Sequence, residues 1–220
     1  MEGMISILFE DTDVIAVDKP EGLAAIPERH PQGGSLLELL QAQRDEKLFV
    51  VHRIDKGTSG VIVFARNAQA HCFLNQQFEA RQVEKVYLAL VHGVVGEDTG
   101  VIDQPLRQCG SGRSAVDPQR GKASVTDFCV VERFTSHTLI EARPRTGRRH
   151  QIRVHLYHVG HPVSGDPLYG DSAIQRTFPR LMLHAQRLTL QLPSGAELTV
   201  ETPASVTFTS LCQNLRGEKS

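Results

Sequence analysis

Residues 181–203 have the sequence LMLHAQRLTLQLPSGAELTVETP, and this stretch decides the fold class. Apolar and polar residues alternate before and after Pro193-Ser194-Gly195, which is typical of two half-buried β-strands joined by a tight turn. Strands that a tight turn connects run antiparallel. The stretch therefore predicts a β-hairpin within an antiparallel sheet.

Most other patterned segments, taken outward from this hairpin, also predict strands, and helices come between them irregularly. The predicted helices are residues 35–43, with Ser35 as N-cap, 68–81 and 146–160. The predicted strands are residues 5–10, 14–20, 47–55, 60–66, 85–95, 125–134 and 138–144. Residues 107–124 lack periodicity and predict an exposed loop or hairpin tip. This order favours an α+β fold with a mixed, mostly antiparallel sheet.

Length and composition indicate one globular domain that covers residues 1–220. The chain has 40% hydrophobic and 22% charged residues, which is ordinary for a soluble protein. It contains no run of 18 apolar residues, so we predict no membrane span. The N-terminus lacks the basic segment of a signal peptide, and the four cysteines are far apart. Scattered cysteines without a signal predict reduced thiols in a cytoplasmic protein.

Charge is concentrated in one segment, although the net charge is only -1. Residues 143–153 hold five arginines and no acid. With Thr146 as N-cap and Gly160 as the end of the helix, Arg148 and Arg149 would lie in the first helical turn, where cations oppose the helix dipole. Such an arrangement favours a bound anion, either a phosphate or a carboxylate of the protein. The alternative is a solvated basic face that acids elsewhere in the chain neutralise.

Another polar segment, residues 52–60 (HRIDKGTSG), lies between apolar strands. Flanking strands can hold such a loop rigidly enough for catalysis, although many polar loops only connect elements. A hydrolase triad of His52, Asp55 and Ser59 is excluded, because three members on one short loop hardly converge and no G-x-S-x-G motif is present.

Four histidines follow the arginines closely but do not predict a metal site. Their spacing matches neither H-E-x-x-H nor a Cys/His finger, and no cysteine is near. We therefore predict core or surface histidines, and no metal, at His150, His155, His158 and His161.

Residues 52–66, HRIDKGTSGVIVFAR, resemble the signature of the RluA-type family of RNA pseudouridine synthases. Later motifs of that family follow in the expected order as RTGRRHQIRVHL, GHPVSGDPLYG and RLMLHAQRL, and VDKPEGL and GKASVT also match. The likeness covers roughly residues 5 to 205. Ile54 stands where leucine is usual, a near-isosteric difference. The resemblance implies a mostly antiparallel sheet with peripheral helices and a single catalytic domain without a separate N-terminal RNA-binding domain.

This resemblance implies that the protein isomerises uridines in structured RNA, tRNA or ribosomal RNA or both, to pseudouridine. The reaction gains and loses no group and moves no electrons overall, so we expect neither cofactor nor metal. The uridine has to leave its stack, so base flipping is expected. We predict a monomer. The alternatives are a non-catalytic RNA-binding module of the same fold and an enzyme acting on a free nucleoside, against which the arginine cluster argues.

The same resemblance implies the catalytic residues. Asp55 is the catalytic carboxylate, and Arg153 is the guanidinium that keeps it ionised. Tyr87 stacks on the uracil and is a candidate to assist removal of the C5 proton. Arg53 helps to occupy the space that the flipped base leaves.

Further residues are predicted to contact the RNA or to support the site. Lys19 is predicted to be structural or a distant phosphate contact. The predicted substrate-binding residues are Arg53, His52, Thr58, Arg148, Arg149 and Gln151. Phosphate contacts are also predicted for Arg107, Arg113, Arg120 and Lys122 in the basic loop.

Overall fold

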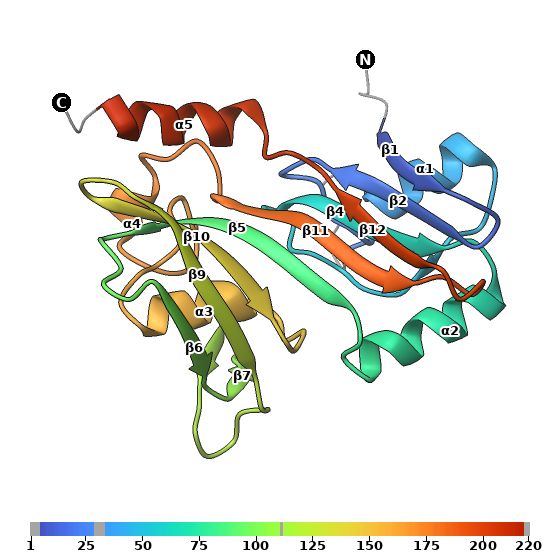
Figure 1. Cartoon of the computed structure of the whole chain (residues 1–220), viewed down its shortest axis with the longest axis horizontal. Coiled ribbons are helices and arrows are strands. Elements are labelled where there is room, and N and C mark those ends of the chain that lie inside the picture. Colours follow the sequence, from blue (N-terminus) through green and yellow to red (C-terminus); the bar gives the residue numbers. More distant parts are fainter. Residues whose placement is uncertain (1–4, 29–33, 111, 218–220) are drawn as a thin grey trace. The chain divides into compact units, whose positions relative to one another are not determined.

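The computed structural model describes residues 5–28, 34–110 and 112–217 (Figure 1). The chain forms two compact units. The first unit comprises Met1–Lys85 and Ala185–Pro203, and the second comprises Val86–His184 and Ala204–Ser220. Strands β5 (Glu84–His92) and β11 (Leu183–Gln191) each have residues in both units. The expectation of a single domain over residues 1–220 stays a prediction.

The first unit is a sheet with two helices. Its strand order is β1-β2-β4-β11, with β3 paired to β4 and β12 paired to β11. The pairs β1–β2, β2–β4, β3–β4 and β11–β12 are antiparallel. Besides β11, its elements are β1 (Ser6–Glu10), β2 (Val14–Lys19), α1 (Leu36–Arg44), β3 (Phe49–Val50), β4 (Ser59–Ala65), α2 (Ala68–Glu79) and β12 (Glu197–Glu201).

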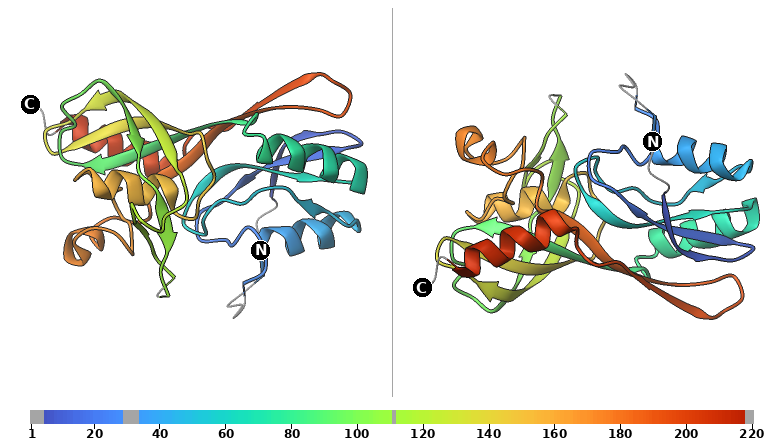
Figure 2. Two further views of the ribbon diagram at one scale, coloured as in Figure 1. Left: turned by 90° about the horizontal axis from the view of Figure 1, so that it is seen from below. Right: turned by 90° about the horizontal axis from the view of Figure 1, so that it is seen from above.

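Alternation along β2 and β4 sends successive side chains to opposite faces of this sheet. On one face, the helix residues Ala70 and Leu74 of α2 share a cluster with Val14, Ala16, Val61 and Val63. On the other face, Leu36 and Leu40 of α1 pack with Ile15, Val17, Ile62 and Phe64. Figure 2 shows the two helices, α1 in blue and α2 in teal, on opposite sides of these strands. All twelve residues are buried, which explains why residues 14–17 of β2 and 61–65 of β4 are all apolar.

Helix α1 begins at the predicted cap. The Ser35 hydroxyl accepts a hydrogen bond from the Glu38 backbone N–H at 3.3 Å, and the Glu38 carboxylate accepts one from the Ser35 N–H at 2.8 Å. These two bonds satisfy donors that the first turn of a helix leaves unpaired. The Ser35 hydroxyl also donates to the Glu38 carboxylate at 2.8 Å; this bond, and secondarily the bond from the Ser35 N–H, lower the pKa of the Glu38 carboxyl, because they favour its charged form.

Gly60 is a position in β4 that admits no side chain. Its φ is +113°, and a Cβ there would lie 2.1 Å from the carbonyl oxygen of Ala185. We expect Gly60→Ala to lower the free energy of unfolding by about 2–3 kcal/mol, because strain and the clash add. Chemical denaturation measures this loss. Gly34→Ala is the matched control, since its Cβ would meet no atom within 4 Å; equal stability of the two variants would contradict the prediction.

In the second unit the order of the sheet strands is β5-β10-β9-β6, and β7 and β8 form a separate hairpin. The strand pairs in both are antiparallel. Its strands besides β5 are β6 (Thr99–Asp103), β7 (Leu106–Gln108), β8 (Ser114–Val116), β9 (Val125–Arg133) and β10 (His137–Pro144). Its helices are α3 (Gln151–His158), α4 (Ser172–Gln175) and α5 (Val206–Gly217). One apolar cluster joins β5, β10, α3 and α5.

The start of α3 corrects a prediction. Thr146 is not its N-cap; His150 occupies that position in the left-handed conformation, with φ 57° and no side-chain capping bond. Arg148 and Arg149 therefore precede the helix and do not lie in its first turn. The conflict with the helix dipole that we expected for these two cations does not arise.

The α+β class and the mostly antiparallel sheet are confirmed. The segment of residues 107–124, expected to be an exposed loop or hairpin tip, contains a hairpin, because β7 pairs with β8. We call β7, β8 and the loop between them the basic hairpin. The strand run expected within residues 47–55, which we expected to end in a polar loop, is shorter than predicted, since only Phe49–Val50 forms β3. Among the residues that the structure describes, no helix is long and apolar enough to cross a membrane.

Candidate active site

Asp55 lies in a turn between β3 and β4 and is partly buried. The Thr58 backbone N–H donates to the Asp55 carbonyl at 3.0 Å, which closes the turn. The Gly22 N–H donates to the Lys56 carbonyl at 2.9 Å and ties the turn to the segment that follows β2. Backbone bonds on both sides thus hold the loop in one conformation. Thr58 itself is buried, and Arg53 is exposed beside the turn.

Lys19, at the end of β2, stabilises the same turn through its side chain. Its side chain is fully buried, and its ammonium donates to the carbonyls of Pro20 (2.8 Å), Leu23 (2.7 Å) and Lys56 (3.1 Å). A buried ammonium requires such acceptors. Because one of them belongs to the residue after Asp55, Lys19 positions the Asp55 backbone. This supports a structural role for Lys19.

His52 fixes the other end of the loop. Its Nε2 accepts a hydrogen bond from the Val63 N–H of β4 at 3.0 Å, and its ring stacks on Phe78 with centroids 4.8 Å apart. Desolvation, and secondarily the positive charge of Lys85, lower the pKa of His52 to about 3. The imidazole is therefore neutral near pH 7 and holds the loop to the sheet. That His52 and Thr58 also contact substrate stays a prediction.

Arg153 projects from α3 and forms a buried two-pronged ion pair. Its Nε and Nη2 donate to the two carboxylate oxygens of Asp166, each at 2.7 Å. Arg153 is 4% exposed and Asp166 is 1% exposed. Such bidentate pairs fix the plane of the guanidinium as well as its charge. The orientation of Arg153 thus depends on Asp166.

Asp166 in turn organises the loop around it. Its Oδ1 accepts from the backbone N–H groups of Leu168 (2.9 Å) and Tyr169 (3.2 Å), and its own N–H donates to Gln175 Oε1 (3.2 Å). The Tyr169 ring lies under the Arg153 guanidinium, with Cζ 5.2 Å from the centroid. The Asp166 carboxylate and the Tyr169 ring therefore fix the orientation of the Arg153 guanidinium, and the bonds to Asp166 fix the carboxylate in turn.

Gln151 uses its whole amide group inside the protein. Its Nε2 donates to the Val125 carbonyl (2.9 Å) and the Thr126 hydroxyl (3.0 Å). Its Oε1 accepts from the Thr146 hydroxyl (2.6 Å) and the Arg148 N–H (3.0 Å). These bonds attach the loop before α3 to β9. That Gln151 also binds RNA stays a prediction.

Tyr87 lies on β5, directly opposite Ala142 of β10. Its side chain is partly buried and packs against the apolar cluster of the second unit. The pairing of β5 with β10 sets the position of Tyr87 within the second unit. Its role in catalysis stays a prediction.

The five arginines between residues 143 and 153 fall into two groups. Three have acidic partners: Arg143 pairs with Glu141 (2.6 Å), Arg145 with Asp127 (2.5 Å) and Arg153 with Asp166 (2.7 Å). Arg148 and Arg149 are exposed and form no ion pair within the part of the chain that the structure describes. The net positive charge of this segment therefore lies at Arg148 and Arg149.

Three of the four histidines near α3, His150, His155 and His161, form hydrogen bonds within the protein. His155 is buried between the Thr126 hydroxyl (2.9 Å) and the Gln104 carbonyl (3.0 Å), and desolvation lowers its pKa. The Tyr169 hydroxyl lies 2.9 Å from His150 Nδ1. In the described ranges, no group of three or more His, Cys, Asp or Glu side chains could hold a metal ion.

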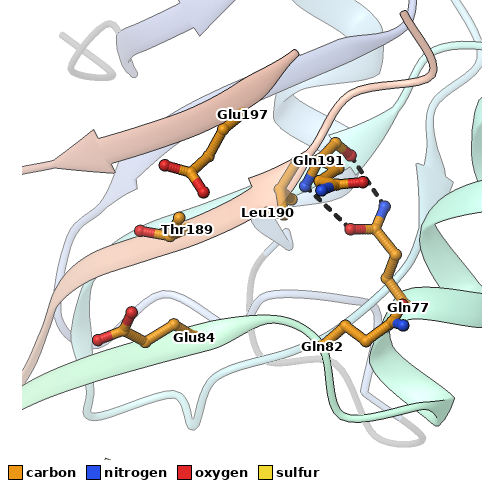
Figure 3. A pocket seen from close by; sticks show the side chains of 7 residues that line it. All are labelled: Gln77, Gln82, Glu84, Thr189, Leu190, Gln191 and Glu197. Carbon is orange, nitrogen blue, oxygen red and sulfur yellow. Dashed lines mark hydrogen bonds between the residues drawn. The ribbon is translucent and has the colours of Figure 1, made fainter. Parts of the chain in front are cut away.

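A cavity of about 290 Å³ in the first unit is a poor candidate for a phosphate-binding site. Seven residues line it: Gln77, Gln82, Glu84, Thr189, Leu190, Gln191 and Glu197 (Figure 3). Its amide Gln77 already exchanges two hydrogen bonds with the Gln191 backbone. The two carboxylates would repel phosphate. None of the predicted site residues lines this cavity.

Comparison with protein-family models identifies the family of this chain. The model described as RNA pseudouridylate synthase matches residues 13–158, which include Asp55, Tyr87 and Arg153. The chain belongs to this family. It is thus an RNA pseudouridine synthase, an isomerase that acts on RNA, and the RluA-type resemblance is confirmed.

Curated relatives and solved structures resemble this synthase over most of its length. It is 37% identical to the ribosomal large subunit pseudouridine synthase D of Pseudomonas aeruginosa, over 98% of this chain and 73% of that protein. It is 41% identical to the dual-specificity RNA pseudouridine synthase RluA of Vibrio vulnificus, over 86% of this chain and 78% of that protein. The solved human RNA pseudouridylate synthase domain containing 1 superposes with a TM-score of 0.80 and 28% identity, covering 97% and 95% of the two chains.

Asp166 and Tyr169 are features of the synthase that sequence reasoning missed. Both lie in GHPVSGDPLYG, a segment used only as a sign of the family. A signal was present, because an aspartate within a Gly- and Pro-rich segment near an arginine cluster is a candidate ion-pair partner. The distance of 13 residues along the chain hid the pairing.

Proposed function

We propose that this synthase converts specific uridines of structured RNA to pseudouridine with Asp55 as its catalytic carboxylate, without a cofactor or metal. The observation that carries the proposal is the way the protein holds Asp55. Its turn is fixed by backbone bonds, by buried Lys19 and by the His52–Val63 bond. Preorganisation of this kind is what a catalytic group needs. Loss of turnover in Asp55→Asn, developed in the Discussion, is the test.

Arg153 is proposed to keep Asp55 ionised during the reaction. A carboxylate in a partly dry pocket has a raised pKa, and a nearby guanidinium lowers it again. The ion pair with Asp166 supports this role, because it fixes the guanidinium plane before RNA binds. Tyr87 is proposed to stack on the uracil and to assist removal of the C5 proton.

The target uridine is proposed to flip out of its helix. An enzyme that changes the glycosidic bond of a stacked base has to extract that base first. Arg53 is exposed and lies two residues before Asp55, so it is our candidate to occupy the vacated space.

The phosphate contacts are proposed for the cations that the protein leaves without an acid. Arg148 and Arg149 have carbonyl and imidazole partners, at 3.4 and 3.5 Å, and stay exposed. Near them, a Cβ on Gly112 of the hairpin tip would lie 3.7 Å from Arg149 Nη2. The hairpin and the loop after it add the exposed cations Arg113, Arg120 and Lys122. Arg107 is also exposed, although it pairs with Asp117 at 3.3 Å. Together they form a basic surface of the second unit.

RNA affinity should fall steeply between about 50 and 200 mM salt, because bound phosphates release counterions. The double variant Arg148→Gln/Arg149→Gln should reduce the slope of log K against log salt by about 1–2, since each arginine that no longer binds a phosphate lowers it by about one. Filter binding across a salt series measures both. Arg187→Gln is the matched control, since this arginine already pairs with Glu201 at 3.1 Å. A slope unchanged in the double variant would count against phosphate binding by these two arginines.

The substrate is proposed to be ribosomal RNA, tRNA or both. The names of the relatives support this range, since one is a ribosomal large subunit synthase and another has dual specificity. We propose that the synthase acts as a monomer in the cytoplasm, to which its four free cysteines are suited. Mapping of pseudouridine in total RNA from cells with and without the gene identifies the target site.

A further inference from the structure

Tyr169 is a buried group of the second unit that the proposed reaction does not use. It is 5% exposed. Its hydroxyl accepts a hydrogen bond from the Ser114 backbone N–H at 2.8 Å and lies 2.9 Å from Nδ1 of His150. Ser114 belongs to β8 of the basic hairpin, and His150 is the N-cap residue of α3. One hydroxyl thus joins two elements that the sequence separates by more than 30 residues.

The ring and backbone of Tyr169 contact the Arg153 site at the same time. The ring lies under the Arg153 guanidinium, and the Tyr169 N–H donates to Asp166 at 3.2 Å. The Tyr169 carbonyl accepts from Gln175 Nε2 at 3.0 Å, so the residue has little freedom to move. The position of the hydroxyl is therefore coupled to the position of Arg153.

The hairpin has a small apolar base on the same residue. Leu106 of β7 and Val154 of α3 form a buried cluster with Tyr169. Apolar contacts of this kind resist separation but allow sliding, because they lack direction. The hydrogen bond to the Ser114 N–H supplies direction, since it weakens steeply when its geometry changes. The bond to the Tyr169 hydroxyl therefore adds a directional contact between the hairpin and the residue that packs on α3.

We propose that Tyr169 is a positioning residue. Its hydroxyl holds the basic hairpin in a fixed position relative to α3, the helix that carries Arg153, so that the cations that bind phosphates keep a constant distance from the catalytic arginine. This inference rests on the proposed function. Without the hydroxyl, the buried Ser114 N–H loses this acceptor. The hairpin then moves away from α3, so that the Ser114 N–H can donate to water instead. The cations of the hairpin then contribute less to RNA binding, while the ring still supports Arg153.

Tyr169→Phe tests the proposal, because it deletes the hydroxyl and keeps the ring. Tyr157→Phe is the matched control: this neighbouring tyrosine of α3 is 49% exposed, and its ring centroid is 5.9 Å from that of Tyr169. Amide hydrogen exchange in the absence of RNA is the first measurement. We expect the Ser114 N–H to exchange about 10-fold faster or more in Tyr169→Phe and unchanged in Tyr157→Phe, as removal of one protecting bond requires. Unchanged exchange in both variants would overturn the proposal.

RNA binding and single-turnover rates are the second measurement. In Tyr169→Phe we expect affinity to fall about 5- to 10-fold, with the rate at saturating RNA within about 3-fold of the wild type, since remote binding energy and the chemical step separate in this way. A purely structural role would lower the melting temperature and leave the affinity of the folded fraction unchanged. That result would also overturn the proposal.

A double-mutant cycle with Arg113, at the hairpin tip, decides whether the hydroxyl acts through the hairpin. Arg113→Ala should weaken RNA binding about 3- to 10-fold in the wild type and less than about 2-fold in Tyr169→Phe, because a displaced hairpin no longer holds Arg113 against a phosphate. Equal decreases in affinity in the two backgrounds contradict the coupling. If the wild type itself makes no pseudouridine, the proposed function fails; an active wild type with an indistinguishable Tyr169→Phe removes this inference alone.

Discussion

Asp55→Asn is expected to abolish pseudouridine formation in a protein that still folds and binds RNA. The turn around Asp55 is held by backbone bonds and by Lys19 and His52, none of which uses the charge of the Asp55 carboxylate. Asparagine has nearly the same shape but cannot act as a nucleophile or base. We expect the rate to fall by about 10⁴-fold or more, as for removal of a principal catalytic group.

Tritium release from RNA labelled at uridine C5 measures this loss directly, because the C5 hydrogen leaves when the new bond forms. Asp98→Asn is the matched control, since this carboxylate is 86% exposed and pairs with Arg133 at the surface. Circular dichroism and RNA binding verify that Asp55→Asn is folded. Turnover close to that of Asp98→Asn would remove Asp55 from the role that we propose.

The ion pair between Arg153 and Asp166 should give the largest stability effect. Removing one partner of a buried pair leaves the other charge uncompensated and typically costs about 3–5 kcal/mol. We therefore expect Arg153→Met and Asp166→Asn each to lower the free energy of unfolding by about 3 kcal/mol or more. Urea denaturation of the single variants measures these decreases.

The double variant Arg153→Met/Asp166→Asn separates stability from catalysis. Because both charges of this ion pair are removed together, most of the stability should return, and asparagine keeps an oxygen for the Leu168 and Tyr169 N–H groups. Turnover should stay more than about 10²-fold below the wild type, because the proposed guanidinium is gone. Activity that recovers together with stability would reduce Arg153 to a structural residue.

Local patterns in the sequence determined much of the fold. Alternation placed the strands on both sides of Pro193-Ser194-Gly195, and β11 and β12 pair there as predicted. Ser35 and Glu38 form the capping box that begins α1. Such features depend on residues that are close together along the chain. They can therefore be recognised in the sequence without knowledge of the tertiary structure.

The motifs of the candidate site were also readable in the sequence, because HRIDKGTSG and RTGRRHQIR are short and specific. The family that they indicated is confirmed. The roles of His52 and Gln151 were not readable. Their ring and amide are used on Val63 and on Val125 and Thr126, partners at least 11 residues away.

What the sequence alone determined is therefore most of the strands, the first helix cap, the hairpins and the family. Only the tertiary structure decided which charges are neutralised. It paired Arg145 with Asp127 and Arg153 with Asp166, left Arg148 and Arg149 without acids, and made His150, not Thr146, the N-cap of α3. The physical reason is that ion pairs and buried hydrogen bonds depend on distances in space, and a local pattern contains no information about which distant strand brings the partner.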